Sequence, residues 1–452
     1  MAPSPHDLIH ETFGRNEQEL IELHRAIVRF PTVNHGDGTP ANEDQFAAFG
    51  REYLKKAGVE SRILESAPHR ANLLAETGDG GPTMLWMSHS DVVPPGDEAA
   101  WTHGPFSGAL EDGRIYGRGA NDCKMLVAAS LFAMAQLKAL GLPRGGTLRV
   151  AVGADEEVGG ELGFGWLARE HPEFLRADVA ICEGAGSCLG CFEDGIPVCS
   201  VGTGEKGRYE VTYRVRGEGG HACTPWGKFN PISVLHELMN RIEAWRPYPA
   251  PASPVFAHVG RWVGFEGGID ENNLEEAIGR LENQSDSLIR SLRGQSRMTF
   301  TPTMVGAGDK SNALPTEARL VCDIRTLPGQ PREEVERMAH DFADDLRGVE
   351  IEIQTTTDPS VSDFPDSIAE MFERATRLAV GAPVKTVPVW SVGATDARFV
   401  RSVGTPVYGY QLVHPDADPN RLGIHCIDES IEASMLLPCA LSLAHSAVEF
   451  CS

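Results

Sequence analysis

Residues 84–124 read MLWMSHSDVVPPGDEAAWTHGPFSGALEDGRIYGRGANDCK, and the rest of the chain is organised around this stretch. It opens with the apolar run Met84–Met87, which is long enough for one buried strand. Residues two apart on an extended backbone face the same way, so His89 and Asp91 are predicted to lie side by side. A metal-bound imidazole is usually held like this, with its second ring nitrogen donating to a carboxylate. The alternative is a loop histidine beside a solvated aspartate.

The composition is that of an ordinary soluble globular protein. The chain has 452 residues, of which 41% are hydrophobic and 23% charged, and its length favours two domains. The net charge is −24, and no basic run interrupts it. We therefore expect no nucleic-acid partner and no anionic membrane surface as a partner.

The N-terminus and the cysteines point to an intracellular setting. The first residues, MAPSPHDLIHETFGRNEQEL, do not place an apolar stretch after a basic start, so no signal peptide is predicted. No run approaches the length of a membrane span, and no membrane association is predicted. The ten cysteines are scattered, and Cys188-X-X-Cys191 is the only close pair in the sequence. A structural zinc site there lacks a second ligand pair, so we expect reduced thiols in a cytoplasmic protein.

Strands alternate with helices through the first 200 residues or so. This order predicts an α/β domain whose mostly parallel sheet is sandwiched by helices. Functional residues of such sheets gather beyond the carboxyl ends of the strands. Four acidic residues follow apolar strands directly, namely Asp91, Glu156, Glu157 and Glu183.

The pattern changes after Gly202. Arg208–Arg216 alternates aromatic or β-branched residues with charged or polar ones, which predicts a half-buried strand with one wet face. Two strand–helix–strand passages predict a small α+β module inserted into the first domain. We therefore expect a catalytic domain formed by residues 1–203 and 358–452, with an inserted domain at residues 204–357.

Two further helices are predicted, one on each side of residue 358. Residues 247–296 are irregular, with Pro and Gly followed by a polar helix at Leu274–Arg290, and no role is assigned to this segment. A long apolar helix is predicted at Glu429–Phe450.

The residues at the strand ends form one chemical set. Its members are His89, Asp91, Asp122, Glu156, Glu157, Glu183 and, near the end of the chain, His425. Carboxylates with two imidazoles are the ligand mix of Zn²⁺ or a neighbouring divalent ion. Five ligands exceed what one tetrahedral catalytic zinc needs, but they suit two ions roughly 3.5–4 Å apart that share a bridging carboxylate.

The pair Glu156-Glu157 is the most informative part of this set. Adjacent residues after a strand point apart, so one can bind metal while the other stands over a metal-bound water. Burial and like charges raise a carboxylate's pKa, which suits a base that takes a proton and later returns it. A solvated turn is the alternative for a Glu-Glu pair in isolation.

Seven motifs support a resemblance to a known family. They occur in the order SHSDVVP, GRGANDCK, ADEEVGG, GGHACTPWGKFNP, SNALPTEARLVCDIRTLPG, ATDARF and GIHCIDESIE. From about residue 15 onward the chain resembles the metallopeptidase family of acetylornithine deacetylase, succinyl-diaminopimelate desuccinylase, aminoacylase, carnosine dipeptidase and glutamate carboxypeptidase. The spacing of the motifs is most similar to the desuccinylase and aminoacylase branches.

The resemblance implies a role for each metal ligand. Asp122 would bridge both metals. His89 and Glu183 would complete one site, and Glu157 and His425 the other. The peptide bond after Asp122 is often cis in the family, and an acidic residue commonly follows at the position that Cys123 occupies here.

The resemblance also implies roles for residues that bind no metal. Glu156 would be the general acid/base and Asp91 the partner of His89. The inserted module resembles the family's ferredoxin-like lid and dimerisation domain, in which His221 matches a histidine that reaches a neighbouring subunit's site and steadies the oxyanion. A lone loop histidine is the alternative for that residue.

Three more residues match substrate-binding positions of the family. Asn312 and Arg325 match lid residues that grip the substrate's carboxylate, a task that suits the planar fork of arginine. A structural ion pair is the alternative for Arg325. Thr395, together with Asp396, matches a turn that lines the pocket.

These observations predict a metal-dependent hydrolase of amide bonds. The resemblance implies a deacylase or carboxypeptidase acting on an N-acyl amino acid or small peptide with a free carboxylate. It also implies Zn²⁺, one or two ions per subunit with Mn²⁺ or Co²⁺ as alternatives, a small-molecule substrate, and a homodimer formed through the lid domain. A dipeptidase, an aminohydrolase acting on another C–N bond, and a catalytically silent metal-binding scaffold are the alternatives.

Overall fold

The computed structural model describes residues 3–39, 41–78, 80–193, 195–281, 286–417 and 421–451. Contacts divide the chain into two compact units. Unit 1 comprises Met1–Thr203, Ser362–Val389 and Thr395–Ser452, and unit 2 comprises Gly204–Val361 and Trp390–Ala394.

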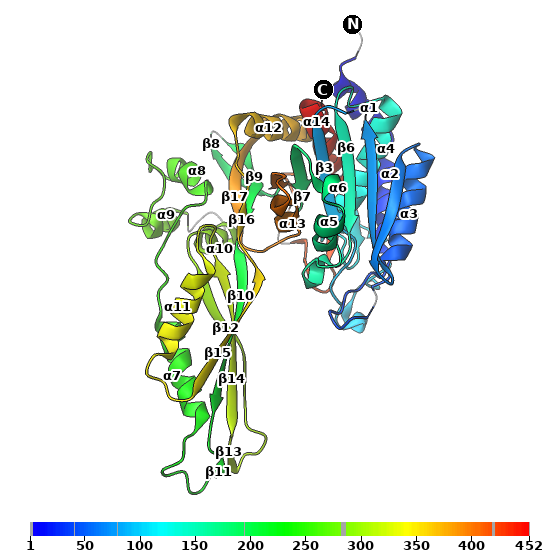
Figure 1. The fold of residues 1–452 in the computed structure, drawn as a ribbon. Coiled ribbons are helices and arrows are strands. Elements are labelled where there is room, and N and C mark those ends of the chain that lie inside the picture. The colour runs from blue at the N-terminus through cyan, green and yellow to red at the C-terminus, as the bar shows by residue number, and fades with distance from the viewer. Residues whose placement is uncertain are drawn as a thin grey trace. The chain divides into compact units, whose positions relative to one another are not determined.

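Unit 1 is built on a mixed sheet (Figure 1). In spatial order its strands are β1 (Glu60–Ala67), β2 (Arg70–Gly78), β6 (Thr147–Gly153), β3 (Thr83–His89), β7 (Val179–Cys182), β18 (Val407–Gly409) and β9 (Ile196–Glu205). The four strands from β6 to β18 are parallel, whereas β1, β2 and β9 pair antiparallel with their neighbours.

The prediction of a mostly parallel sheet was therefore wrong in this respect, because the sheet is mixed. Strands β1 and β2 are joined by two residues, and so short a connection permits only an antiparallel pair. Strand β2 also pairs antiparallel with β6, so β2 runs against both of its neighbours.

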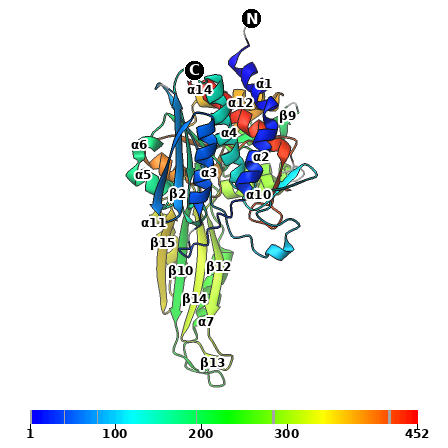
Figure 2. The ribbon, with the colours of Figure 1, turned by 90° about the vertical axis from the view of Figure 1, so that its right-hand side faces the viewer.

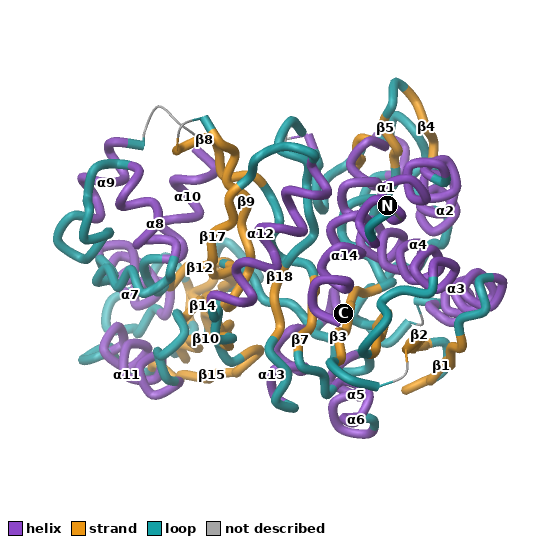
Figure 3. Tube along the Cα trace, turned by 90° about the horizontal axis from the view of Figure 1, so that it is seen from above, coloured by secondary structure: helices purple, strands orange, loops and turns teal. Residues whose placement is uncertain are grey.

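Helices cover both faces of this sheet (Figure 3). One face carries α1 (Pro5–Arg15), α2 (Glu17–Val28), α3 (Glu43–Lys56), α4 (Lys124–Leu140), α12 (Asp366–Val380) and α14 (Leu436–Cys451), and the other carries α5 (Phe164–Glu170), α6 (Pro172–Leu175) and α13 (Ala397–Ser402). The side chains of β3 alternate between these layers. Met84 and Trp86 join the first core, whereas Leu85 and Met87 join the second. Burial on both faces explains why β3 reads as a continuous apolar run.

One described helical run has the length and hydropathy of a membrane span, although the sequence predicted none. It is Ala433–Cys451, with a mean hydropathy of 1.3, and 78% of it is buried within the protein. Helix α14, which forms most of this run, packs against α4 and α12. A core helix of a globular domain has these same properties.

The predicted helix Glu429–Phe450 begins later than expected. Ser430–Glu432 forms strand β19, which pairs with β5 (Arg114–Tyr116), itself paired with β4 (Ala109–Glu111). Arg114 donates to the carbonyl oxygen of Ser430 at 3.2 Å and to its hydroxyl at 3.1 Å. These bonds favour an extended backbone at Ser430, so the helix begins only at Leu436.

Unit 2 is an antiparallel sheet covered on one face by helices (Figure 2). Its strands are, in spatial order, β12 (Thr299–Ala307), β14 (Glu317–Thr326), β10 (Gly207–Arg216) and β15 (Val349–Thr357), and its covering helices are α7 (Pro231–Ala244) and α11 (Arg332–Ala343). Burial alternates along most of β10, as the sequence predicted, although Thr212 is also buried. Tyr209, Val211 and Tyr213 face the helices, whereas Arg208 is exposed on the open face.

The segment without an assigned role contains three helices. They are α8 (Val255–Trp262), α9 (Leu274–Arg280) and α10 (Asp286–Gln295). The single predicted helix Leu274–Arg290 is wrong, because α9 ends at Arg280, and residues 282–285 lie outside the described part of the chain. The remaining short strands are β8 (Cys188–Glu193), β11 (Gly220–His221), β13 (Ala313–Leu314), β16 (Ser360–Val361) and β17 (Lys385–Ser391).

Candidate metal-dependent active site

Three neighbouring parallel strands end at one edge of the unit 1 sheet. His89 is the last residue of β3, Glu183 directly follows β7, and Glu156-Glu157 form a short 3₁₀ turn (Glu156–Val158) just after β6. The order β6–β3–β7 therefore brings residues from three distant segments to the same edge, where parallel sheets place their functional groups.

Asp122 divides its two carboxylate oxygens between two imidazoles. Its Oδ1 lies 3.2 Å from Nε2 of His89, and its Oδ2 lies 3.2 Å from Nε2 of His425. Each imidazole also faces one more carboxylate. His89 Nε2 is 3.3 Å from Glu183 Oε1, and His425 Nε2 is 3.3 Å from Glu157 Oε2. The five predicted metal ligands thus lie together as two groups joined by Asp122.

The spacing of these atoms fits shared metal ions. Two ligands that each bind one tetrahedral zinc at about 2.0–2.2 Å lie roughly 3.3–3.5 Å apart, which is close to the separations across Asp122. Oε1 of Glu157 is buried and has no hydrogen-bond partner among the described residues. A carboxylate oxygen left in this state is costly unless a cation compensates it.

The charge balance of the cluster supports the same conclusion. Burial raises the pKa of Glu183 to about 7, and it also raises the pKa of Glu157. Burial opposes ionisation of Asp122, but hydrogen bonds from His425 and His89 hold the pKa of this carboxyl below its usual range. So many carboxylates packed together need positive charge, and divalent cations supply it.

Cys123 adds a sulfur atom to the first of the two groups. Its thiol lies within 4.8 Å of ligand atoms of His89 and Glu183. The Asp122–Cys123 peptide bond is cis, as the resemblance implies. The thiol thus occupies a position where the family commonly has a carboxylate.

Asp91 organises both His89 and the Glu156-Glu157 turn. Nδ1 of His89 donates to the backbone carbonyl of Asp91 at 3.1 Å and lies 3.4 Å from its Oδ1. A proton held on Nδ1 leaves the lone pair of Nε2 free for a metal. The carboxylate of Asp91 also accepts from the backbone N–H of Glu156 at 3.1 Å and of Glu157 at 3.2 Å.

Glu156 has the electrostatic surroundings of a general base. Burial raises its pKa well above the usual value; His89 opposes this effect, and the charge of Glu183 adds to it. Asp396, whose own pKa burial raises to about 8, acts in the same direction as Glu183. A raised pKa suits a carboxylate that takes a proton and later returns it.

Asn34 supports Asp91 from behind and was not predicted from the sequence. Its Nδ2 donates to Asp91 Oδ2 at 3.0 Å and to Asp155 Oδ1 at 3.2 Å, while Arg70 donates to its Oδ1 at 3.0 Å. A single asparagine in a loop carries no local pattern that would have indicated this role.

Glu429 holds the loop that carries Asp122. Its Oε1 accepts from the backbone N–H groups of Asn121 and Asp122 at 3.1 and 3.2 Å. Its Oε2 accepts from Gly119 N–H at 3.1 Å and from Arg118 at 2.7 Å. Glu429 lies in the motif GIHCIDESIE, four residues after His425, and this proximity was the only sequence signal for it.

The predicted substrate-binding residues fall in both units. Thr395 lines a small cavity beside His89 and Glu183 in unit 1, and its Oγ1 accepts from the N–H of Ala397. His221 and Asn312 lie together in unit 2, where β11 pairs with β13 and the N–H of Ala222 donates to the Asn312 carbonyl at 3.0 Å.

Arg325 lies at the other end of the unit 2 sheet from His221. It donates from Nε to Asp323 Oδ1 at 2.7 Å, and Arg208 donates to the second oxygen of the same carboxylate at 2.8 Å. The structural ion pair considered for Arg325 is therefore present. Its predicted role toward substrate stays a prediction.

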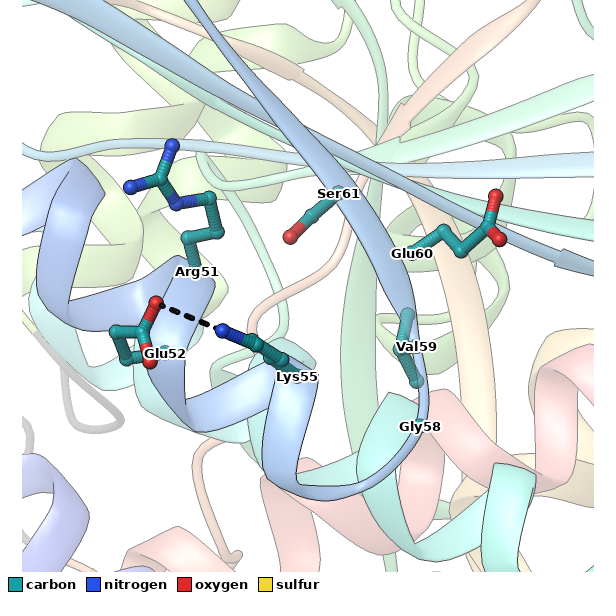
Figure 4. Close-up of a pocket in the computed structure, with 7 residues that line it drawn as sticks. All are labelled: Arg51, Glu52, Lys55, Gly58, Val59, Glu60 and Ser61. Carbon is teal, nitrogen blue, oxygen red and sulfur yellow. Dashed lines mark ion pairs between the residues drawn. The ribbon is translucent and has the colours of Figure 1, made fainter.

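A separate open hollow of about 550 Å³ lies on unit 1. Its lining residues lie between the end of α3 and the start of β1 (Figure 4). It is lined by Arg51, Glu52, Lys55, Gly58, Val59, Glu60 and Ser61. Lys55 pairs with Glu52 at 3.8 Å. None of the described residues that line it is a histidine or a cysteine, so it lacks the imidazole ligands found at the strand ends.

Comparison with known proteins decides the family. The model of peptidase family M20/M25/M40 matches residues 85–449. The chain belongs to this family. It is accordingly a hydrolase whose chemistry is the metal-dependent cleavage of amide bonds.

Named relatives of this M20-family chain cover most of its length. It is 28% identical over 417 residues to a succinyl-diaminopimelate desuccinylase of Methylorubrum populi. The matched region covers 88% of this chain and 91% of the relative. Its fold is similar to that of Sso-CP2, an M20 family metallo-carboxypeptidase from Sulfolobus solfataricus, with a TM-score of 0.71 and 19% identity. The match covers 96% of this chain and 98% of Sso-CP2. It is also similar to Bacillus subtilis YXEP, a dinuclear metal binding peptidase, with a TM-score of 0.61, 15% identity and coverage of 96% and 98%.

Proposed function

We propose that the protein cleaves the amide bond of an N-acyl amino acid, or of a small peptide with a free carboxylate, as a deacylase or carboxypeptidase. The observation that carries the proposal is Asp122, whose two oxygens face His89 and His425 separately. The resemblance to a desuccinylase supports an acylated amino acid as the substrate. In this family a glutamate at the position of Glu183 is found mostly in deacylases and carboxypeptidases, which supports the same choice.

The metal in this proposal is Zn²⁺, one or two ions per subunit, with Mn²⁺ or Co²⁺ as alternatives. Asp122 would be shared, His89 with Glu183 would hold one ion, and Glu157 with His425 the other. When bound, the ions supply Lewis acidity, which polarises a carbonyl and acidifies water.

The side chains of the protein carry the proton transfers. Glu156 takes the proton from the attacking water and returns it to the nitrogen of the leaving amine. Its raised pKa suits both transfers. Asp91 keeps the Glu156-Glu157 turn in place through the hydrogen bonds that it accepts from the two backbone N–H groups of the turn.

We also propose that unit 2 binds substrate. His221 and Asn312, which lie together, would both reach the site of a neighbouring subunit, where His221 would steady the oxyanion. Asn312 of one subunit and Arg325 of the other would grip the carboxylate of the substrate, and Thr395 of unit 1 would line the pocket. Arg325 has the planar fork for this task, and it would exchange its present bond to Asp323 for the substrate.

The proposal includes a homodimer formed through unit 2 as a ferredoxin-like lid, in a cytoplasmic protein. The order β10, α7, β12, β14, α11, β15 supports the ferredoxin-like description. Strand β12 lies at the edge of the sheet, and the side chains of Met304 and Val305 on it are 63% and 64% exposed. An exposed apolar edge strand is a template for pairing with a second copy.

A substrate panel tests this function. Protein loaded with Zn²⁺, Mn²⁺ or Co²⁺ is assayed on N-acyl amino acids, dipeptides and aromatic amines. We expect turnover of N-acyl amino acids, and Glu156→Gln lowers kcat by roughly 10²–10⁴-fold with unchanged metal content. Turnover of dipeptides or aromatic amines alone would support the dipeptidase or aminohydrolase alternatives. If no member of the panel is hydrolysed with any metal and Glu156→Ala leaves the function of the protein unchanged, the silent-scaffold alternative would be supported.

A further inference from the structure

The hairpin formed by β8 and β9 places two cysteines opposite each other. Cys188 on β8 and Cys199 on β9 are paired residues of an antiparallel ladder, so their side chains emerge on the same face. At the neighbouring position the N–H of Ser200 donates to the carbonyl of Ser187 at 3.0 Å.

The hydrogen bond between Ser200 and Ser187 shows whether the two cysteines form a hydrogen-bonded or a non-hydrogen-bonded pair of the ladder. Hydrogen-bonded and non-hydrogen-bonded pairs alternate along an antiparallel ladder. Cys188 and Cys199 therefore occupy a non-hydrogen-bonded position, where opposed Cα atoms are about 4.5 Å apart. That separation lies within the range that a disulfide spans, about 4.4–6.8 Å.

The two thiols differ in exposure and in ionisation. Cys199 is fully buried, whereas Cys188 is partly exposed. A hydrogen bond from Cys199 lowers the pKa of Cys188 to about 6, and the same bond together with burial raises the pKa of Cys199. Burial raises the pKa of Cys322 and that of Cys439 to about 12, so these thiols stay protonated at neutral pH.

We propose that Cys188 and Cys199 are a redox-responsive pair that closes to a disulfide when the protein meets a peroxide. The Cys188 thiolate attacks one oxygen of hydrogen peroxide, the O–O bond breaks, and sulfenic acid forms while the second oxygen leaves as water after taking a proton. The Cys199 sulfur then attacks the Cys188 sulfur, and the sulfenic oxygen departs as a second water with the Cys199 proton. A dithiol reductant reverses the change.

The bond would brace the segment that carries Glu183. Ser200, next to Cys199, accepts from the N–H of Gly186 at 3.2 Å and donates to the carbonyl of Ser187 at 3.1 Å. These contacts already fasten the Glu183–Ser187 segment to β9. A disulfide one residue further along adds a covalent tie at the same place, independently of which substrate the enzyme takes.

Mass spectrometry of the metal-loaded, full-length protein tests the proposal. The reduced protein is treated with stoichiometric hydrogen peroxide, alkylated, and digested without reductant. We expect one cross-linked peptide pair joining Cys188 to Cys199, the loss of two hydrogen atoms from the intact mass, and full reversal by dithiothreitol. The oxidised protein should also melt a few degrees higher, because the cross-link restricts the unfolded chain.

Three variants give the matched comparisons. Cys199→Ser should stop at a sulfenic acid on Cys188 that dimedone traps, and Cys188→Ser should form neither species. Cys223→Ser removes an exposed thiol of unit 2 and should leave the cross-link intact. Should a serine variant fail to fold, the pH dependence of Cys188 alkylation in the unaltered protein replaces it, with a midpoint expected at about pH 6.

Other outcomes would overturn the proposal. A bond from Cys188 to Cys191, oxidation confined to another cysteine, or free Cys188 and Cys199 after peroxide treatment each excludes the pair. An alkylation midpoint above pH 8 would show that Cys188 has no special reactivity.

Discussion

At the residue scale, the candidate active site is a set of shared hydrogen-bond acceptors. Asp122 faces two imidazoles, and Asp91 accepts two backbone N–H groups of the Glu156-Glu157 turn while it also contacts His89. Because each carboxylate serves several partners, the loss of one leaves several groups unsatisfied in a buried place. Small changes at supporting residues should therefore reach the metal ligands.

Glu429 is the clearest supporting residue. In the unaltered protein, the N–H donors of this loop face carboxylate oxygens of Glu429. Glu429→Gln puts an amide N–H₂ group in place of one of these oxygens, so the loop that carries Asp122 should loosen. We expect metal affinity to fall by about 10–100-fold and the free energy of unfolding to fall by about 3 kcal/mol. Zinc competition titrations and denaturant unfolding measure these effects.

Glu432→Gln is the matched control for Glu429. Glu432 lies on β19, pairs with Arg114 at 3.3 Å and is 35% exposed, so its loss should cost little. If Glu429→Gln and Glu432→Gln lowered metal affinity and stability equally, Glu429 would have no special role in holding the loop that carries Asp122.

At the element scale, sheet order and helix packing decide where the side chains go. Strands β6, β3 and β7 are neighbours, so the residues that follow them meet. Helix α2 packs against α4. His24 of α2 is fully buried and donates from Nε2 to the carbonyl of Ala120, in the loop before α4, at 2.8 Å. A buried imidazole held in this way makes the helix layer sensitive to acid.

His24 should make the protein less stable in acid. Burial lowers the pKa of His24 to about 4 from 6.5, so the folded state binds fewer protons than the unfolded state between these values. Stability is then complete above pH 6.5 and declines as the pH falls toward about 4, by on the order of 3 kcal/mol. Urea unfolding at several pH values measures this loss, and His24→Gln should reduce it.

The control for the acid sensitivity is His236→Gln, which replaces an exposed histidine of α7. It should leave the pH dependence of unfolding unchanged. An acid loss of the same size in His24→Gln as in the unaltered protein would assign the effect to other groups.

At the scale of the whole molecule, metal and assembly are expected to contribute to stability. Removing metal with a chelator should abolish turnover and lower Tm, because the buried carboxylates then repel one another. The pKa of Glu183 is raised to about 7 in the absence of metal, so the metal-free protein should lose stability as the pH rises from 4.5 to about 7. The gain in Tm on adding zinc should therefore grow over the same window, as scanning fluorimetry would show. A gain that shrinks with rising pH would contradict this expectation.

The homodimer is tested by introducing charge on the edge strand. Met304→Glu together with Val305→Glu should give a monomer by light scattering, because charges on β12 oppose pairing with a second copy. Leu110→Glu on β4, where the side chain is 40% exposed, is the control and should not change the assembly. A variant with glutamates on β12 that stays dimeric would place the interface elsewhere.

Much of this arrangement could be predicted, and the errors have local causes. The apolar run before His89 and the alternation along Arg208–Arg216 are periodic patterns, and both became strands as expected. The start of the last helix was predicted wrongly because apolar periodicity does not reveal that Arg114, far away in sequence, binds Ser430. The prediction of a mostly parallel sheet was wrong because β2 runs against both β1 and β6, and β9 runs against β18. The two-residue connection between β1 and β2 forces one of these reversals.

The sequence alone determined which chemical groups follow the strands, since strand period and residue type are local properties. His89, Glu156, Glu157 and Glu183 could be found in this way. Only the tertiary structure decided what holds them, because Glu429 reaches the N–H of Asp122 across 307 residues and Asn34 reaches Asp91 across 57. Hydrogen bonds between such distant segments follow no periodicity along the chain, so they become visible only once the fold has brought the segments together.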